Sequence, residues 1–375
     1  MLTRRQFIAG TVGAWAVSKV RGVAAAEQLL LQHMAFPQDL ATPLEYYDRL
    51  ITPVEAFFVR SHFGPPALDV KRRVSIDGLV SKPLDLTVEE LRKFPEVSTT
   101  SVLQCAGNGR SLFVPHMPGV QWGHGAMGQA KWTGVRLKDV LESAGVQPDG
   151  AFVHLQGWDT APLPSVPKFQ RCIPLARAMG EGTILAYNMN DEPLTPAHGA
   201  PLRLIVPGWA GDNWVKWLRN LHVDSREPEG FYYQTAYRYP KKLGAPGEAM
   251  PPENMGPLTV VPVKSIIGRP LDGSTGTTGK QEVVGVAFSG GSAIAKVEVS
   301  LDGGATWKTA KLEGDPGAGR WQVFRHEFTA DKSGGSFTAM SRATDAAGNT
   351  QPKDPAWNPS GYMWNGWHTV SWRIV

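Results

Sequence analysis

The sequence predicts an α+β domain followed by a β-sandwich domain, and three observations support this prediction. The 375 residues suffice for two domains that each bury a core. Gly (41) and Pro (30) are abundant and only 19% of residues are charged, so strands and ordered loops should outweigh long surface helices. Residues 240–256 are rich in Pro, Gly and Lys, which is typical of a linker. We place the first domain at residues 27–250 and the second at residues 255–375.

The first domain mixes short strands with short helices. Apolar runs at 57–62, 74–80 and 152–157 predict strands, whereas the Gly-rich stretch 125–134 has the composition of an ordinary loop. The predicted helices are a segment from its N-cap Thr87 to Arg92, the amphipathic residues 135–144, which end at Gly145, and residues 173–179.

Strand-like runs alternate with turns in the second domain, at the spacing of a β-sandwich. Residues 300–304 read Ser-Leu-Asp-Gly-Gly and supply the turn of a hairpin. The predicted strands are Leu258–Ile267, Gln281–Phe288, Ala295–Leu301, Thr306–Leu312, Trp321–Phe328 and Ser336–Thr344.

The N-terminus has the pattern of an export signal. Arg4-Arg5 precede a mildly apolar run at 8–17, and Ala24–Ala26 offer small residues for cleavage. Paired arginines before a weakly apolar run are typical of a twin-arginine signal, which exports folded proteins, so we assign residues 1–26 to one. An ordinary secretory signal or a buried helix is the alternative. The assignment predicts a periplasmic protein.

The charge balance changes when the predicted signal is removed. Four of the 38 Lys and Arg residues lie in it and none of the 34 acids, so equal numbers of bases and acids remain. This near-neutrality argues against nucleic-acid binding. No later apolar run approaches the ~18 residues that span a bilayer, so we expect no membrane span.

The stretch Ser101 to Arg110 reads SVLQCAGNGR and holds one of the two cysteines. Small residues follow Cys105 and allow a bulky group to approach the backbone. A thiolate in a loop of free N–H groups suits a soft metal ligand or a nucleophile. A disulfide between Cys105 and Cys172 is the default in an exported protein and stays open. We expect instead that Cys172 is a buried free thiol.

Cationic side chains gather in two further stretches. Arg60 and His62 are two residues apart in a predicted strand and share one face. The guanidinium fork of Arg60 suits an oxyanion, although Arg-x-His alone more often marks a surface strand. His198, Arg203 and Lys216 fall in or beside apolar runs, where unpaired cations are costly to bury. These three residues therefore predict an anionic partner.

These motifs resemble the sulfite oxidase family over nearly all of the chain after the predicted signal. The matching patterns are Gln-Cys-Ala-Gly-Asn, Val-Arg-x-His, His-Gly-x-Pro-x-Arg with Val-Lys-Trp-Leu after it, and Val-Ser-Leu-Asp-Gly-Gly-x-x-Trp in the second domain. The resemblance implies an α+β fold with a sulfite-oxidase-type molybdopterin-binding domain followed by an immunoglobulin-like β-sandwich domain. It also implies a homodimer through the sandwich.

The resemblance assigns a cofactor and a role to each candidate residue. It implies a molybdenum–molybdopterin cofactor, a pyranopterin dithiolene, whose metal is bound by Cys105. On the substrate side it places Arg60, Arg110, Trp122 and Tyr237. On the cofactor side it places His62, Gln129, Ala130, His198, Arg203 and Lys216, with the phosphate held by His198 and Arg203 and contacted by the Gly-rich stretch.

The implied reaction is oxidation of sulfite to sulfate by oxygen-atom transfer. The chain has no Cys-x-x-Cys-His, so we expect no c-type haem, and we also expect no haem domain like that of the vertebrate relatives. Electrons would pass to an external periplasmic c-type cytochrome. One departure concerns the substrate: the family has Trp-Asn-x-Arg-Gly in its last domain, whereas this chain has Ser360 in place of the arginine. Either another cation serves or the pocket is less selective for sulfite.

Three other functions fit parts of the sequence. An exported molybdenum reductase of methionine sulfoxide would lack the C-terminal sandwich, whereas a sulfane dehydrogenase would need partner subunits. A non-catalytic binding module would use the sandwich and carry no molybdenum. A zinc hydrolase is disfavoured because the nine histidines show no His-Glu-x-x-His spacing.

Overall fold

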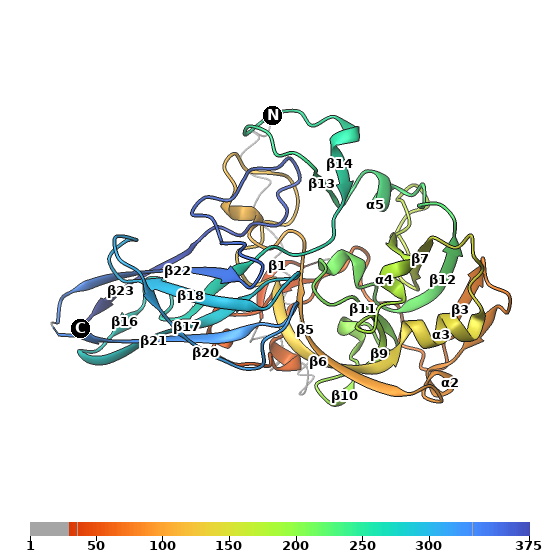
Figure 1. The fold of residues 1–375 in the computed structure, drawn as a ribbon, viewed down its shortest axis with the longest axis horizontal. Helices are drawn as coiled ribbons and strands as arrows, with labels where there is room; N and C mark the ends of the chain where they lie inside the picture. Colours follow the sequence, from red (N-terminus) through yellow and green to blue (C-terminus); the bar gives the residue numbers. More distant parts are fainter. Residues whose placement is uncertain (1–29, 36, 332) are drawn as a thin grey trace, which may run out of the picture.

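The computed structural model describes residues 30–35, 37–331 and 333–375. The predicted signal, residues 1–26, lies outside this part. Two bodies lie side by side, one built from the first two thirds of the chain and one from the last third (Figure 1).

Two five-stranded sheets form the first body. One has the order β10-β9-β6-β5 with β11 added to β9, and the other has the order β4-β3-β12-β7-β8. The strands are β3 (Val74–Gly78), β4 (Leu84–Leu86), β5 (Glu96–Gln104), β6 (Met127–Arg136), β7 (Phe152–Gly157), β8 (Gln170–Pro174), β9 (Ile184–Met189), β10 (Glu192–Pro193), β11 (Arg203–Ile205) and β12 (Leu218–Asp224). The short strands β1 (Leu31–Met34) and β2 (Asp39–Ala41) pair with each other, as do β13 (Arg238–Pro240) and β14 (Met255–Pro257).

Short helices connect these strands: α2 (Val88–Leu91), α3 (Leu137–Ala144), α4 (Leu175–Ala178) and α5 (Phe231–Gln234). The predicted cap of α2 is confirmed, because Thr87 Oγ1 accepts a hydrogen bond from Glu90 N at 3.2 Å and Glu90 Oε2 accepts one from Thr87 N at 2.8 Å. The helix α3 ends at Gly145, which has φ 67° and closes it in the left-handed region. It begins two residues later than predicted because Val135 and Arg136 pair with β9.

Two segments near the site differ from the sequence-based expectation. Residues 57–62 do not form a continuous strand, and only Val59 pairs, with Leu40, through backbone bonds of 3.0 and 2.9 Å. Most of the Gly-rich stretch 125–134, expected to be a loop, belongs to the long strand β6, whose neighbours β5 and β9 satisfy its backbone. Gly134 permits this pairing, since a Cβ there would lie 1.9 Å from the Leu185 carbonyl oxygen.

The second body is the predicted β-sandwich, with the sheets β15-β17-β21-β20 and β16-β23-β22-β18-β19. Its strands are β15 (Lys264–Arg269), β16 (Thr275–Gly276), β17 (Gly279–Phe288), β18 (Ile294–Ser300), β19 (Lys308–Thr309), β20 (Lys311–Glu313), β21 (Gln322–Ala330), β22 (Ser336–Asp345) and β23 (His368–Ile374). The predicted strand 306–312 is two strands, because the chain crosses from one sheet to the other at Ala310. The last strand, β23, was not predicted, although its side chains alternate between buried and exposed.

Direct contacts join the sandwich to the strands that carry the site. Gln129 on β6 accepts a hydrogen bond from Trp321 N at 2.7 Å and donates to the Trp321 carbonyl at 3.3 Å. Lys264, fully buried at the start of β15, donates to Gln104 Oε1 at 3.2 Å. Because Gln104 precedes Cys105, the sandwich supports the cysteine loop from behind.

The predicted linker, residues 240–256, overlaps β13 and β14, and the rest of it connects these two strands. Within the described part of the chain, none of the helices has the length and apolar character that a membrane crossing requires.

Candidate active site

Two pockets meet at Cys105. The inner pocket has about 740 Å³ of space not filled by protein atoms and the outer one about 1570 Å³, and both figures include open solvent. Arg60, His62, Cys105 and Tyr237 line both. The inner pocket continues to Asp159, His198, Arg203, Asp212 and Lys216, and the outer one to His33, Arg110, Trp122, Tyr232, Ser360 and Tyr362.

The cysteine loop is held by backbone bonds at the end of β5. Cys105 N donates to the Ala126 carbonyl at 2.9 Å, and Asn108 N donates to the Cys105 carbonyl at 3.0 Å. Gly107 leaves room for Arg110 here, because a Cβ would lie 2.9 Å from its guanidinium carbon. Both cysteines are free, and Cys172 is buried as predicted. Burial raises the pKa of the Cys105 thiol, and the nearby Arg60 opposes this shift.

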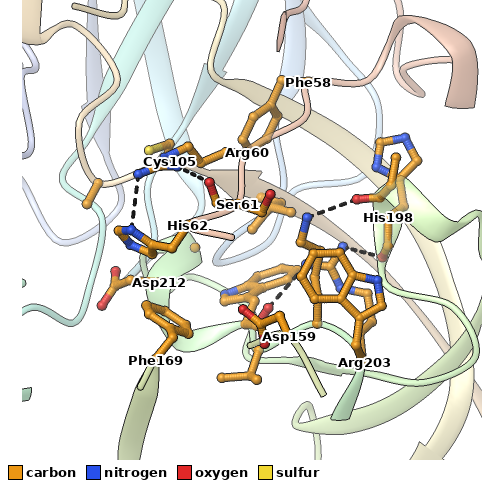
Figure 2. A pocket seen from close by; sticks show the side chains of 18 of the residues that line it. Phe58, Arg60, Ser61, His62, Cys105, Asp159, Phe169, His198, Arg203 and Asp212 are labelled. Carbon is orange, nitrogen blue, oxygen red and sulfur yellow. Dashed lines mark hydrogen bonds between the residues drawn. The ribbon is translucent and has the colours of Figure 1, made fainter. Parts of the chain in front are cut away.

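Three cationic or proton-donating side chains line the far side of the inner pocket (Figure 2). Arg203 donates to the His198 carbonyl at 2.9 Å, and its buried Nε has no hydrogen-bond partner among the described residues. Lys216 Nζ donates to the Ala197 carbonyl at 2.9 Å. Burial, followed by the charge of Arg203, lowers the pKa of Lys216 to about 7. The buried Lys216 ammonium therefore keeps its charge at and above neutral pH only when an anion compensates it.

Arg60, His62 and Tyr237 form a chain of polar contacts between the two pockets. Arg60 Nη2 lies 3.5 Å from His62 Nδ1, and His62 Nε2 lies 2.7 Å from Tyr237 Oη. Burial, with the charge of Arg60, lowers the pKa of His62 to about 3, so the imidazole is neutral. Since a guanidinium only donates, Nδ1 accepts and Nε2 carries the proton that it donates to Tyr237. The Tyr237 hydroxyl hydrogen is then free to bond a group in the pocket.

Arg110 and Trp122 belong to the outer pocket. Arg110 donates from Nη1 to the Val120 carbonyl at 3.0 Å and lies over the Tyr362 ring, at 5.1 Å from its centroid. Trp122 is fully buried, and its Nε1 has no hydrogen-bond partner among the described residues. Both side chains thus line the pocket as the resemblance implied, and their roles toward a substrate stay predictions.

Two predicted cofactor residues do not line either pocket. Gln129 binds Trp321 and also donates to the Leu50 carbonyl at 2.8 Å, so its side chain joins the two bodies. Ala130 is fully buried in the core beneath the site. The prediction came from the family resemblance, whereas in β6 the Gln129 side chain reaches Trp321 and Ala130 packs into the core.

Comparisons with known proteins agree with this geometry. Residues 62–232 match the model of the oxidoreductase molybdopterin binding domain, and residues 257–374 match that of the Mo-co oxidoreductase dimerisation domain. The sulfite oxidase of Arabidopsis thaliana is 33% identical over 86% of this chain and 88% of its own length. The chain belongs to the sulfite oxidase family. The mitochondrial sulfite oxidase of Macaca fascicularis is 36% identical over 86% of the chain, which spans 62% of that relative's length.

A solved structure extends this likeness to the whole fold. The sulfane dehydrogenase SoxCD from Paracoccus pantotrophus matches with a TM-score of 0.79 and 29% identity, over 98% of this chain and 94% of its own. The predicted fold, a molybdopterin-binding domain followed by a β-sandwich dimerisation domain, is confirmed.

The residues of this sulfite oxidase family member fit a molybdenum–molybdopterin cofactor. The cationic inner pocket, with the unpartnered Arg203 Nε, suits an anionic phosphate, and Cys105 offers a soft thiolate to the metal. When bound, the cofactor supplies two-electron redox chemistry and oxygen-atom exchange. His198 and Arg203 would hold its phosphate end, Lys216 its dithiolene side and His62 its ring system.

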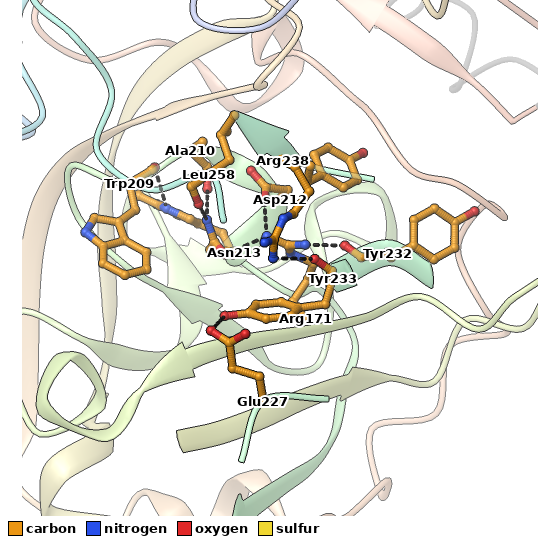
Figure 3. A network of polar contacts seen from close by, with 12 residues as sticks. Arg171, Trp209, Ala210, Asp212, Asn213, Glu227, Tyr232, Tyr233, Arg238 and Leu258 are labelled. Carbon is orange, nitrogen blue, oxygen red and sulfur yellow. Dashed lines mark hydrogen bonds and ion pairs between the residues drawn. The ribbon is translucent and has the colours of Figure 1, made fainter. Parts of the chain in front are cut away.

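Sequence reasoning missed a buried ion pair beside the site (Figure 3). Arg171 and Asp212 have fully buried side chains and approach to 2.6 Å, and Arg171 also donates to Asn213 Oδ1 at 3.2 Å and to the Tyr232 carbonyl. The guanidinium lies 5.2 Å from the centroid of the Tyr237 ring, so the ion pair contacts a residue of the site. A charged residue in the apolar stretch after Arg203 was the available signal.

Two more acidic residues escaped the sequence analysis. Asp39 is fully buried, and its Oδ1 lies 3.4 Å from Arg60 Nη1. Burial raises the pKa of Asp39 to about 6, and that of Asp159 in the inner pocket to about 6 as well. Asp39 therefore offsets part of the charge of Arg60 at neutral pH, which no local pattern indicated.

We expect Tyr237→Phe to lower kcat/KM for the sulfur substrate by roughly 10- to 100-fold, the effect of one hydrogen bond to a charged group. The variant removes both the acceptor of His62 Nε2 and the free hydroxyl donor. Steady-state kinetics of the loaded enzyme measure this loss. Tyr239 lies in β13, outside both pockets. Tyr239→Phe is therefore the matched control and should keep the wild-type kcat/KM. Equal values for Tyr237→Phe and the wild type would remove the hydroxyl from the site.

Lys216 should make the stability of the cofactor-free protein depend on pH. The unfolded chain keeps the lysine proton up to about pH 10.5, whereas the folded protein releases it near pH 7. The unfolded state therefore binds more protons in this window, and the free energy of unfolding rises with pH by about 1.4 kcal/mol per unit from this group.

Urea unfolding at several pH values between these limits, with Lys216→Met as the comparison, isolates the contribution. All other titrating groups are shared by the two proteins, so the wild type should show the steeper rise. Identical slopes would mean that Lys216 remains charged in the folded cofactor-free protein.

Proposed function

We propose that this chain is a molybdenum-dependent oxidoreductase that oxidises sulfite to sulfate and passes the electrons to an external c-type cytochrome. The observation that carries the proposal is the place of Cys105, where a cationic cofactor pocket meets a second pocket containing arginines. The names of the relatives and of the solved structure support a sulfur substrate. Dimerisation through the sandwich, twin-arginine export and a periplasmic location belong to the same proposal.

The residues of the outer pocket would orient the substrate oxygens. Arg60 and Arg110 offer guanidinium donors, and Trp122 offers its free Nε1. These donors leave the sulfur lone pair as the reactive position. The water that supplies the new oxygen must lose its protons. The neutral His62, the Tyr237 hydroxyl and the Asp159 carboxyl are the polar groups that the inner pocket offers for this proton transfer.

Sulfite-dependent reduction of cytochrome c by the molybdenum-loaded protein tests the proposal. Rapid reduction that requires both sulfite and molybdenum is the expected result. If the loaded protein reduces cytochrome c with thiosulfate-derived sulfur but not with sulfite, the reaction class stands and the substrate is different. That second candidate is favoured by the structural match to the sulfane dehydrogenase.

A further inference from the structure

The outer pocket carries less positive charge than its two arginines suggest. Arg60 lies 3.4 Å from the buried Asp39 and also donates to the Ser61 carbonyl. Arg110 donates from Nη1 to Val120 and from Nε to the Ser360 carbonyl at 3.4 Å, and these bonds leave Nη2 for a ligand. One guanidinium charge thus remains without a carboxylate, which matches a singly charged anion better than a doubly charged one.

Part of the pocket wall next to these donors is neutral. Ser360 lines the pocket, but its hydroxyl donates to the Arg238 carbonyl at 3.2 Å. Phe231 and Tyr232 line the same pocket and pack edge to face with ring centroids 5.2 Å apart, and Phe231 remains 46% exposed. Tyr362 stacks on Tyr237 with centroids 5.6 Å apart. Such a surface favours an organic group over a third oxygen.

The size of the pocket points the same way. The outer pocket is open to solvent, and its water-accessible part, about 780 Å³, still exceeds the volume of a four-atom oxyanion. An anion held at Arg60 and Arg110 would leave the aromatic side uncovered. A substituent on the sulfur would reach that side.

We propose, resting on the proposed function, that the same site oxidises organic sulfinates, R–SO₂⁻, beside sulfite. A sulfinate keeps the sulfur lone pair and two oxygens but carries one negative charge, and an organic group replaces the third oxygen of sulfite. Its oxygens face Arg60, Arg110 and Trp122, and its substituent packs against Phe231 and Tyr232.

The reaction balances with the same external acceptor. R–SO₂⁻ and H₂O give R–SO₃⁻, two protons and two electrons. One sulfur–oxygen bond forms, with the oxygen derived from water, and both O–H bonds of that water break. The protons go to solvent, and the electrons leave one at a time to two molecules of the c-type cytochrome.

The test compares sulfite, methanesulfinate and benzenesulfinate as substrates of the loaded wild-type enzyme, with cytochrome c as acceptor. We expect all three to be oxidised and benzenesulfinate to have the higher kcat/KM of the two sulfinates, by about 3- to 10-fold, because its ring can stack. Sulfite oxidation without any sulfinate oxidation would overturn the inference and leave the proposed function standing. Failure of all three substrates would overturn both.

Two variants show whether the aromatic wall makes the selection. Phe231→Ala should lower the ratio of kcat/KM for benzenesulfinate to that for sulfite by about 3- to 10-fold. Leu163→Ala, at an apolar residue that is 60% exposed and lies outside both pockets, should keep the ratio. Ser360→Arg, which adds a cation to the neutral wall, should shift the ratio toward sulfite. Unchanged ratios in both Phe231→Ala and Ser360→Arg would overturn the assignment of this wall.

Discussion

Replacement of Cys105 by serine should abolish sulfite-dependent turnover while the protein remains folded. Outer partners of metal ligands are typically worth about 10- to 100-fold in activity or affinity, so loss of the ligand itself should cost more than about 10²-fold. Serine keeps the volume but replaces a soft thiolate by a hard, protonated hydroxyl. The loop is held by its backbone, through Ala126 and Asn108, and these bonds do not depend on sulfur.

Cys172→Ser is the matched control, because Cys172 is the other free cysteine and lines neither pocket. Turnover per molybdenum atom, measured with cytochrome c, should be that of the wild type in this control. Circular dichroism and the unfolding midpoint check the fold of both variants. Wild-type turnover in Cys105→Ser would exclude Cys105 as the metal ligand.

The second large effect is expected for Arg60→Ala, which should raise the KM for sulfite by about 10- to 100-fold. Arg60 lines both pockets and supplies a charged donor that alanine lacks. The variant also leaves Asp39 buried without its cation, so the carboxyl should take up a proton at neutral pH. Protonation of Asp39 removes the unpaired buried charge, so the variant should remain folded. A rise in KM can then be assigned to the lost guanidinium and not to unfolding.

Arg177→Ala provides the control for removing a partly buried arginine. Arg177 donates to the Pro207 carbonyl and lies over the Trp209 ring, outside both pockets. It should lower the unfolding midpoint without changing the KM for sulfite. An unaltered KM in Arg60→Ala would remove Arg60 from the substrate site.

Local patterns predicted the elements whose structure is set locally. Periodicity and turn chemistry predicted the amphipathic helix, expected at 135–144 and found at 137–144, the cap at Thr87 and the turn-punctuated strands of the sandwich. The prediction for residues 125–134 was wrong. Their glycines suggested a loop, whereas pairing with two distant strands makes most of them part of β6. Tertiary pairing of this kind is invisible to composition.

The candidate site divides in the same way. Cys105, Arg60 and His198 stand in distinctive motifs, and the fold brings them to the same pocket. Asp39 and Arg171 stand in ordinary surroundings, and only the packing of remote segments reveals them as buried partners of site residues. Gln129 is the opposite case. It stands in a motif-like stretch that predicted a cofactor contact, but its side chain binds Trp321 of the sandwich.

The coordination of molybdenum in the purified protein tests the central claim most directly. Metal analysis combined with X-ray absorption at the molybdenum edge should find one molybdenum per chain in the wild type. It should also find one sulfur neighbour fewer in Cys105→Ser. A protein that is folded and expressed with the cofactor available, yet contains no molybdenum, would contradict the account, as would an unchanged sulfur count in the variant.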